Sequence, residues 1–259
     1  MHFFTSSRPL TRSPEWKTPA GMTDPSVQIA LDYHSRWVGT FIEGASWCPF
    51  ARSSRLSGRT TLKALACAPA LGDPLTHWQE LPAWLLEFAD SLDAEVMQIV
   101  VPRVVCTAAD WEHRAKQLLD EFQVLRGGRS VLALAAFHPQ LTVRHETAPG
   151  LIPLLRRSPL PAIQFVRLDA LARVKKGRDN ADRFVSPGSP EFHALLQQPV
   201  RESISDAITR TNFEHVMAAG RASVEASLHA LAEDAAGALR AAGVELVSWN
   251  RENRVPPFE

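Results

Sequence analysis

Cysteine is scarce in this chain of 259 residues, which contains only Cys48, Cys67 and Cys106. The count is odd, the spacings are long and no CxxC pair occurs, which argues against a disulfide framework and a four-cysteine zinc site. Reduced cysteines are typical of cytoplasmic proteins. We therefore expect three free thiols and a cytoplasmic location.

A surplus of charge and a long apolar run are both missing. Lysine plus arginine number 28 and aspartate plus glutamate number 28, so the positive and negative charges cancel. A protein that binds nucleic acid through bulk charge needs a basic surplus. No stretch approaches the roughly 18 uninterrupted apolar residues of a membrane span, and residues 1–22 hold no apolar run of signal-peptide length. The sequence therefore predicts neither nucleic-acid nor membrane partners.

Several well-known catalytic and metal-binding motifs are absent as well. Gly127-Gly128 lacks the other glycines and the lysine of a phosphate-binding loop, and no GxSxG segment occurs. No HxH, HExxH or paired-acid motif completes a metal site. The sequence accordingly indicates no metal, and it specifies neither a cofactor nor an oligomeric state.

What the chain does contain is an alternation of helical and strand patterns. Residues 1–22 hold three prolines and read as an irregular N-terminal arm, residues 23–172 as an α/β core, and residues 173–259 as a linker with C-terminal helices of the same domain. Strands separated by helices favour an α/β or α+β fold. We expect a mixed sheet of about four strands with helices packed on it, plus the C-terminal helical segment.

The individual elements follow from periodicity and capping signals. Helices are expected over 24–46, 76–92 and 107–126, and strands over 60–67, 95–101, 130–137 and within 160–172. A polar connection over 175–190 leads to helices over 199–242, with a break near Thr211-Asn212. The 130–137 segment is almost wholly apolar, so both of its faces should be covered and it should be a central strand.

Four short segments in one order draw attention to a possible site. They are Cys48-Pro49-Phe50-Ala51, Phe137-His138-Pro139, Arg157-Ser158-Pro159 with Pro161, and Arg167 within a strand. Together they resemble the domain-of-unknown-function 1415 family, over roughly residues 30–172. The resemblance implies a first helix leading into the CPFA segment, a strand ending in FHP and a later strand carrying an arginine. It implies a candidate site but no reaction.

The chain departs from that family pattern at several polar positions. Relatives tend to have glutamine where this chain has Ala133, asparagine at Arg156, and threonines where Val96 and Met97 stand. The acidic residue that usually follows the last arginine directly is shifted to Asp169. The resemblance therefore implies a divergent member, whose activity is changed or lost if those polar groups serve chemistry.

Cys48 and His138 allow three interpretations. A thiolate activated by a nearby imidazole would be a nucleophile, although we expect Cys48 at the C-terminal end of a helix, which does not stabilise a thiolate. Cysteine and histidine can also bind haem iron or a metal. Free cysteine is, however, among the most buried residue types, so Cys48 can equally be a core residue.

Arg157 and Arg167 are candidates for anion binding, because guanidinium groups bind carboxylate or phosphate with two hydrogen bonds. The Ser158 hydroxyl could complete such a pocket beside Arg157. Arg167 lies within an apolar strand, where a charge needs a partner. That partner is either a ligand or Asp169, two residues on and on the same strand face.

The leading hypothesis is a small-molecule enzyme that acts on an anionic substrate. Its catalytic residues would be Cys48 and His138, within roughly 8 Å of each other, and its substrate-binding residues Arg157, Ser158 and Arg167. The alternative is a non-catalytic binding or interaction protein, which could hold haem or a metal through Cys48 and His138.

Overall fold

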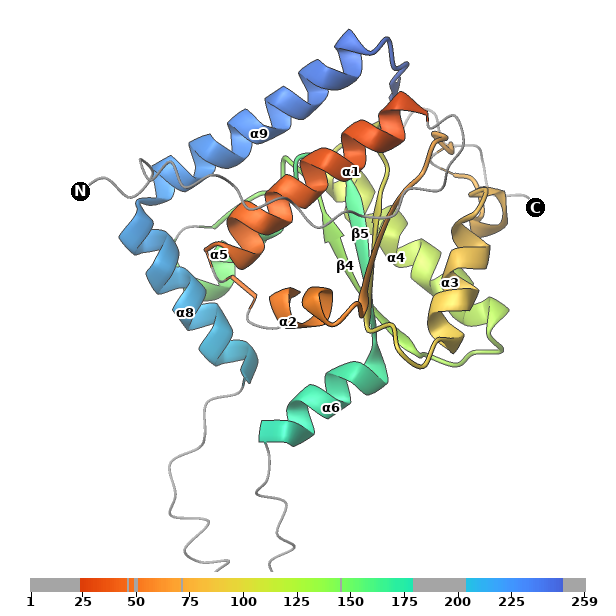
Figure 1. The fold of residues 1–259 in the computed structure, drawn as a ribbon, viewed down its shortest axis with the longest axis horizontal. Coiled ribbons are helices and arrows are strands. Elements are labelled where there is room, and N and C mark those ends of the chain that lie inside the picture. The colour runs from red at the N-terminus through yellow and green to blue at the C-terminus, as the bar shows by residue number, and fades with distance from the viewer. Residues whose placement is uncertain are drawn as a thin grey trace, which may run out of the picture.

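A four-stranded mixed sheet forms the centre of the structure, a computed structural model (Figure 1). The structure describes residues 24–45, 47–48, 51–70, 72–144, 146–178 and 204–248. The expected arm over 1–22 and most of the polar connection over 175–190 lie outside these residues. The strand order is β1 (Thr60–Ala64), β2 (Val96–Val100), β5 (Ala162–Arg167) and β4 (Leu132–Phe137). β1 and β2 are parallel, whereas β5 is antiparallel to both of its neighbours.

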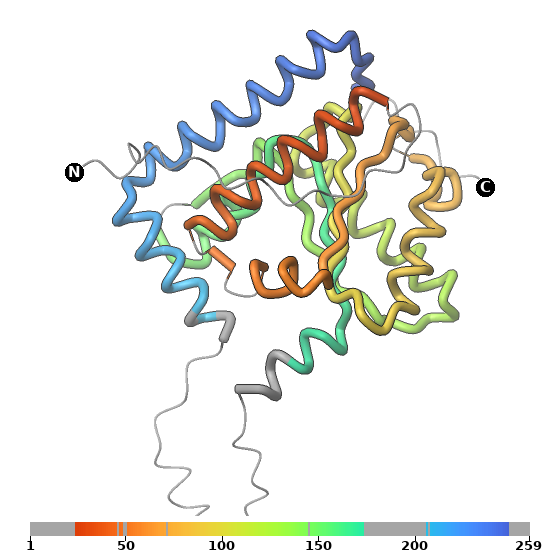
Figure 2. Tube along the Cα trace, viewed as in Figure 1, coloured from red at the N-terminus to blue at the C-terminus, as the bar shows by residue number. Residues whose placement is uncertain are grey.

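Helices cover both faces of this sheet, which Figures 1 and 2 show nearly edge-on. One face carries α3 (Leu81–Asp90) and α4 (Ala108–Leu125), and the other carries α1 (Pro25–Trp37), α8 (Ile204–Ala219) and α9 (Arg221–Ala241). The remaining elements are short: the π-helix η1 (Val38–Glu43), α2 (Ala51–Leu56), the 3-10 helix η2 (Leu75–His77), α5 (Ala148–Leu155), α6 (Leu168–Arg178), and a small pair of β3 (Val104–Val105) with β6 (Val247–Ser248). The α/β fold with C-terminal helices is thus confirmed.

Alternating side chains of the strands form two separate cores. In β2, Met97 and Ile99 face α3 and α4, whereas Val100 faces the layer of α1, α8 and α9. In β4, Leu132 and Phe137 divide in the same way. This is the two-residue period of a sheet that is covered on both faces. Among the helices within the described ranges, none is long and apolar enough to cross a bilayer.

Two helix starts agree with their capping signals. Asp24 caps α1 by accepting a hydrogen bond from the Ser26 backbone, with Pro25 as the first helical residue. Thr107 caps α4 by accepting one from the Asp110 backbone. A short polar side chain in front of a periodic apolar stretch therefore located both N-termini correctly.

The expected helix over 76–92 is interrupted in the structure. A 3-10 turn over Leu75–His77 precedes α3, which begins only at Leu81. Gln79, between the two, has φ +42°, a left-handed conformation that ends a right-handed helix. The periodicity of the apolar residues spans the interruption, so it did not reveal the break.

The expectation that the 130–137 segment forms a central strand is wrong, because β4 lies at one edge of the sheet. Its apolar composition indicates that helices cover both faces of the strand. The composition does not indicate how many strands lie beside it. The free side of β4 is partly covered near its end, where the Arg156 guanidinium donates to the Ala136 carbonyl and the Arg156 carbonyl accepts from the His138 N–H.

The C-terminal helices break at Gly220 and not at Thr211-Asn212, which lie inside α8. Gly220 has φ +83°, a conformation that costs an L-residue about 1 kcal/mol or more. We expect Gly220→Ala to lower the free energy of unfolding by about 1 kcal/mol, measured by urea denaturation. Gly237→Ala is the matched control inside α9, where an added Cβ meets nothing closer than 3.9 Å. It should raise stability by up to about 1 kcal/mol, and an equal loss for both variants would contradict this prediction.

Candidate functional site

The carboxyl ends of β1, β2 and β4 lie at the same end of the sheet, because all three strands run parallel. Cys67, Cys106 and His138 follow these three strands in the sequence. Ser158 precedes β5, which starts at this end because it runs the opposite way. This end of the sheet is therefore where the structure gathers potential catalytic residues.

His138 is buried there, with 3% of its surface exposed. Its Nδ1 accepts a hydrogen bond from the Gln140 backbone N–H at 3.1 Å, and its Nε2 lies 3.8 Å from the Cys106 sulfur. Since Nδ1 is an acceptor, the proton of the neutral ring is on Nε2. Burial lowers the pKa of His138 to about 4, against a weaker hydrogen bond to the Cys106 backbone that raises it. At neutral pH, His138 is therefore an uncharged N–H donor.

Cys106 is the thiol in contact with His138. Burial, and then the charge of Asp110, raise the pKa of Cys106 to about 12, so the thiol stays protonated at neutral pH. The two residues thus form a neutral pair and not a thiolate–imidazolium pair. In this tautomer Nε2 cannot accept the thiol proton, because it already carries one.

Cys48 lies in a different place, in the segment between η1 and α2. Its N–H donates to the Ile42 carbonyl and its carbonyl accepts from the Ala51 N–H. The neighbouring Trp47 carbonyl accepts from the buried Asn212 amide of α8 at 2.9 Å. In the part of the chain that the structure describes, no hydrogen bond joins Cys48 to His138. The structure therefore places Cys48 beside α8.

The loop that carries Cys48 is closed by an ion pair. Glu43, at the end of η1, and Arg55, in α2, meet through two hydrogen bonds of 2.6 Å each. The Glu43 carboxylate raises the pKa of Arg55, against partial burial that lowers it. A bidentate pair of this kind fixes the ends of the loop, and hence the position of Cys48 between them.

Ser158 and Arg157 do reach the His138 region. The Ser158 side chain is buried and donates to the Leu160 carbonyl at 2.5 Å, so its hydroxyl is used within the loop. The Arg157 Nε donates to the Leu141 carbonyl at 2.9 Å. Leu141 closes a turn by donating its N–H to the His138 carbonyl. His138 therefore shapes the turn that holds the Arg157 guanidinium.

Arg167 lies at the opposite end of the sheet. It ends β5, and the five residue steps from Ala162 span about 17 Å of extended chain. Its guanidinium forms two hydrogen bonds with Asp169, of 3.0 and 2.9 Å. The pair lowers the pKa of Asp169, chiefly through Arg167. The expectation that Asp169 shares the strand face is wrong, since α6 already begins at Leu168.

A wider charge network surrounds this pair. Arg173 contacts both Asp169 and Glu95, and Glu95 in turn pairs with Arg59. Arg167 thus belongs to a set of interactions that connects α6 to the residues just before β1 and β2. The structure does not bring it together with Arg157.

Sequence reasoning missed two groups of polar residues that are buried or half-buried. One is Cys106, whose position just beyond the 95–101 strand was a usable signal, because parallel strands place such residues at one end of the sheet. The other is a chain of side chains within the core. His34 Nε2 lies 3.2 Å from Gln98 Oε1, and the Gln98 amide donates to Gln164 Oε1 at 2.9 Å. Single polar residues within apolar patterns give no hint of their partners.

Metal binding has little geometric basis in the described chain. No group of three or more histidine, cysteine or acidic side chains is placed there to hold a metal ion.

No disulfide joins Cys48, Cys67 and Cys106. Their reduced state in the cell stays a prediction.

Comparison with known proteins gives a family and no function. No curated protein matches the sequence significantly, and no solved structure matches it. A family model described as "Protein of unknown function (DUF1415)" matches residues 30–189. The match includes the CPFA, FHP and RSP segments and ends before α8 and α9. The chain therefore belongs to the DUF1415 family of proteins of unknown function.

Proposed function

We propose that the protein binds a small anionic molecule at the carboxyl end of the sheet, with Arg157 as its cationic contact. The observation that carries this proposal is the state of the Arg157 guanidinium. It is half-buried and held in place by the bond from Nε to the Leu141 carbonyl. Within the described ranges, no acidic side chain forms an ion pair with it.

The neighbouring arginine provides the contrast. Arg156 lies 3.4 Å from Glu112 and also donates to the Ala136 carbonyl, so its charge has a partner. A half-buried guanidinium without an acid is costly in the free protein, and an anionic ligand would remove that cost. The two terminal nitrogens of Arg157 can donate to both oxygens of a carboxylate or phosphate.

The protonation states of Cys106 and His138 favour a site that binds an anion over one that carries out thiol chemistry. The Cys106 thiol is neutral and His138 carries its proton on Nε2, so neither is prepared for nucleophilic attack. His138 acts as a positioning residue, because its ring and carbonyl shape the turn from which Leu141 holds Arg157.

An enzyme with Cys48 as nucleophile stays a prediction. In that account His138 would be the base, and Arg157 and Arg167 would orient the substrate. The account requires the Cys48 loop to approach His138 when substrate binds. Cys48→Ser separates the two accounts, because it should abolish such chemistry and leave anion binding unchanged.

The test is isothermal titration of the full chain with inorganic phosphate and, separately, succinate, at low ionic strength. The parent should bind at least one probe, and binding should weaken as salt is added. Arg157→Gln should weaken it by about tenfold or more, the usual effect of losing a charge-assisted hydrogen bond. Arg129→Gln, at an exposed arginine, is the matched control and should bind like the parent.

Two results would overturn the proposal. One is equal binding by the parent and by a folded Arg157→Gln variant. The other is the absence of saturable binding of both probes to the parent. A stronger response to phosphate or to succinate would identify which kind of anion the site prefers.

A further inference from the structure

A small cavity lies between the Cys48 loop and the C-terminal helices. Its volume is about 70 Å³, and its walls come from η1, the Trp47 segment, α8 and α9. None of its lining residues belongs to the carboxyl end of the sheet, where Arg157 and His138 lie. It is therefore a separate feature from the proposed anion site.

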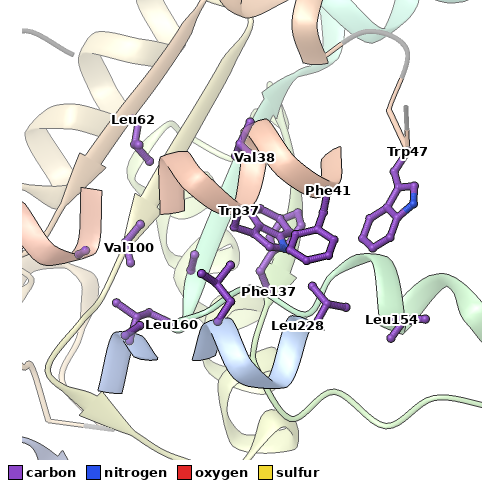
Figure 3. Packing of buried hydrophobic residues seen from close by; sticks show 14 of the residues in the cluster. Trp37, Val38, Phe41, Trp47, Leu62, Val100, Phe137, Leu154, Leu160 and Leu228 are labelled. Carbon is purple, nitrogen blue, oxygen red and sulfur yellow. The ribbon is translucent and has the colours of Figure 1, made fainter. Parts of the chain in front are cut away.

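Two aromatic rings form one wall. Phe41 and Trp47 have their ring centroids 5.6 Å apart and their planes tilted by 38°, and Figure 3 shows them next to each other. The Asn212 amide holds the Trp47 carbonyl, and the Glu43–Arg55 ion pair closes the loop that contains Trp47. This wall is thus preformed, which lowers the entropic cost of binding a ligand.

The opposite wall comes from helices outside the family match. Val216 and Ala219 belong to α8 and Val224 to α9, all beyond residue 189. Val216 and Val224 are buried, whereas Ala219 is exposed and lies at the opening. The cavity therefore exists only because the C-terminal helices pack against the family region.

Polar groups in the lining are few. Besides the Trp47 indole N–H, the lining has the polar side chains of Thr40 and His215, and both of these residues are exposed. Thr40 belongs to a π-helical segment, confirmed by the i to i+5 hydrogen bond from Gly44 to Gly39. π-Helical turns are rare and occur frequently at functional sites.

Size and lining together restrict the occupant. A volume of about 70 Å³ exceeds the roughly 30 Å³ of one water molecule, but is about half of the roughly 150 Å³ of a closed cavity that holds benzene. A single ring would therefore fill this cavity and extend through its opening, and a larger ligand would not fit. Two aromatic rings favour a flat ring packed against their faces or edges. An imidazole and a hydroxyl nearby favour one hydrogen-bonding group on that ring.

We propose that this cavity is a binding site for a small uncharged aromatic molecule, of the size of a single ring, that carries a hydroxyl group. The ring packs against Phe41 and Trp47, and the hydroxyl bonds with His215 at the opening. Binding here would join the family region to the C-terminal helices through one ligand.

The experiment uses phenol as the probe and the indole N–H signal of Trp47 in ¹H–¹⁵N spectra of the full chain, assigned by its loss in Trp47→Phe. Phenol should shift this signal saturably. Ala219→Leu should weaken binding by about tenfold or more, because the larger side chain fills the opening. Ala218→Leu is the matched control at the adjacent exposed position and should bind like the parent.

Toluene tests the role of the hydroxyl. The parent should bind phenol more tightly than toluene by about threefold or more, the usual net effect of one hydrogen bond. His215→Leu should remove this difference while still binding toluene. The proposal is overturned if phenol gives no saturable shift, if a folded Ala219→Leu variant binds phenol like the parent, or if His215→Leu retains the full preference for phenol.

Discussion

Lowering the pH from 7 to 4 is expected to reduce the free energy of unfolding by about 3 kcal/mol through His34 alone. His34 has 1% of its surface exposed, and burial lowers its pKa from 6.5 to about 4. The hydrogen bond with Gln98 opposes this shift but is the weaker effect.

The sign follows from which state binds more protons. In the unfolded chain His34 takes up a proton as the pH falls through 6.5, whereas the folded protein resists protonation until about pH 4. The unfolded state is therefore favoured progressively across this window. Below about pH 4 both states are protonated and this group adds no further loss. His138, whose pKa is also lowered to about 4, should act in the same direction.

Urea denaturation at pH 7.0, 5.5 and 4.5 measures the effect. His34→Gln removes the titrating ring but keeps an N–H donor for Gln98, so its stability should depend less steeply on pH than that of the parent. His113→Gln is the control, because His113 is exposed on α4. If His34→Gln loses as much stability as the parent between pH 7.0 and 4.5, His34 does not cause the acid sensitivity.

The second large effect is expected for Trp37→Ala, which should lower the free energy of unfolding by about 3–5 kcal/mol. Trp37 is fully buried at the end of α1, and its ring meets the Phe137 ring edge-on with centroids 5.4 Å apart. Figure 3 shows both rings at the centre of the cluster below α1. The substitution would leave a cavity between α1 and β4 that the surrounding helices cannot close.

Thermal denaturation should show the difference directly, with a fall of roughly 10 °C in Tm for Trp37→Ala. Trp84→Ala provides a matched control on α3. Trp84 is half-exposed, and Lys63 lies over its ring at 4.6 Å, so its loss should cost only about 1 kcal/mol. Equal losses for the two variants would mean that Trp37 is not a centre of the core.

The same contact gives part of the family pattern a structural explanation. Phe137 of the FHP segment packs on Trp37, and Trp47, just before the CPFA segment, packs on Phe41. Leu154 and Leu160, on either side of the RSP segment, belong to the same core cluster. The apolar residues in or next to the CPFA, FHP and RSP segments therefore pack in one core, in addition to any role of their polar residues in a site.

The sequence by itself determined the family, the class of fold and several element boundaries. Period-two apolar strands and period-3.6 helices are local patterns, and caps such as Asp24 and Thr107 act on residues only two or three positions away. Such features need no knowledge of distant contacts. They were therefore predictable from neighbouring residues.

Contacts between distant segments were decided only by the tertiary structure. β4 is an edge strand, which its apolar sequence did not reveal. Burial of the two faces of a strand does not specify how many strands lie beside it. His138 contacts Cys106 because the parallel direction of β2 and β4 brings their carboxyl ends to the same end of the sheet. The Trp47 carbonyl, next to Cys48, is bound by Asn212 of α8. In each case the partner depends on strand order and helix packing, which are set by the whole core and not by the residues beside the site.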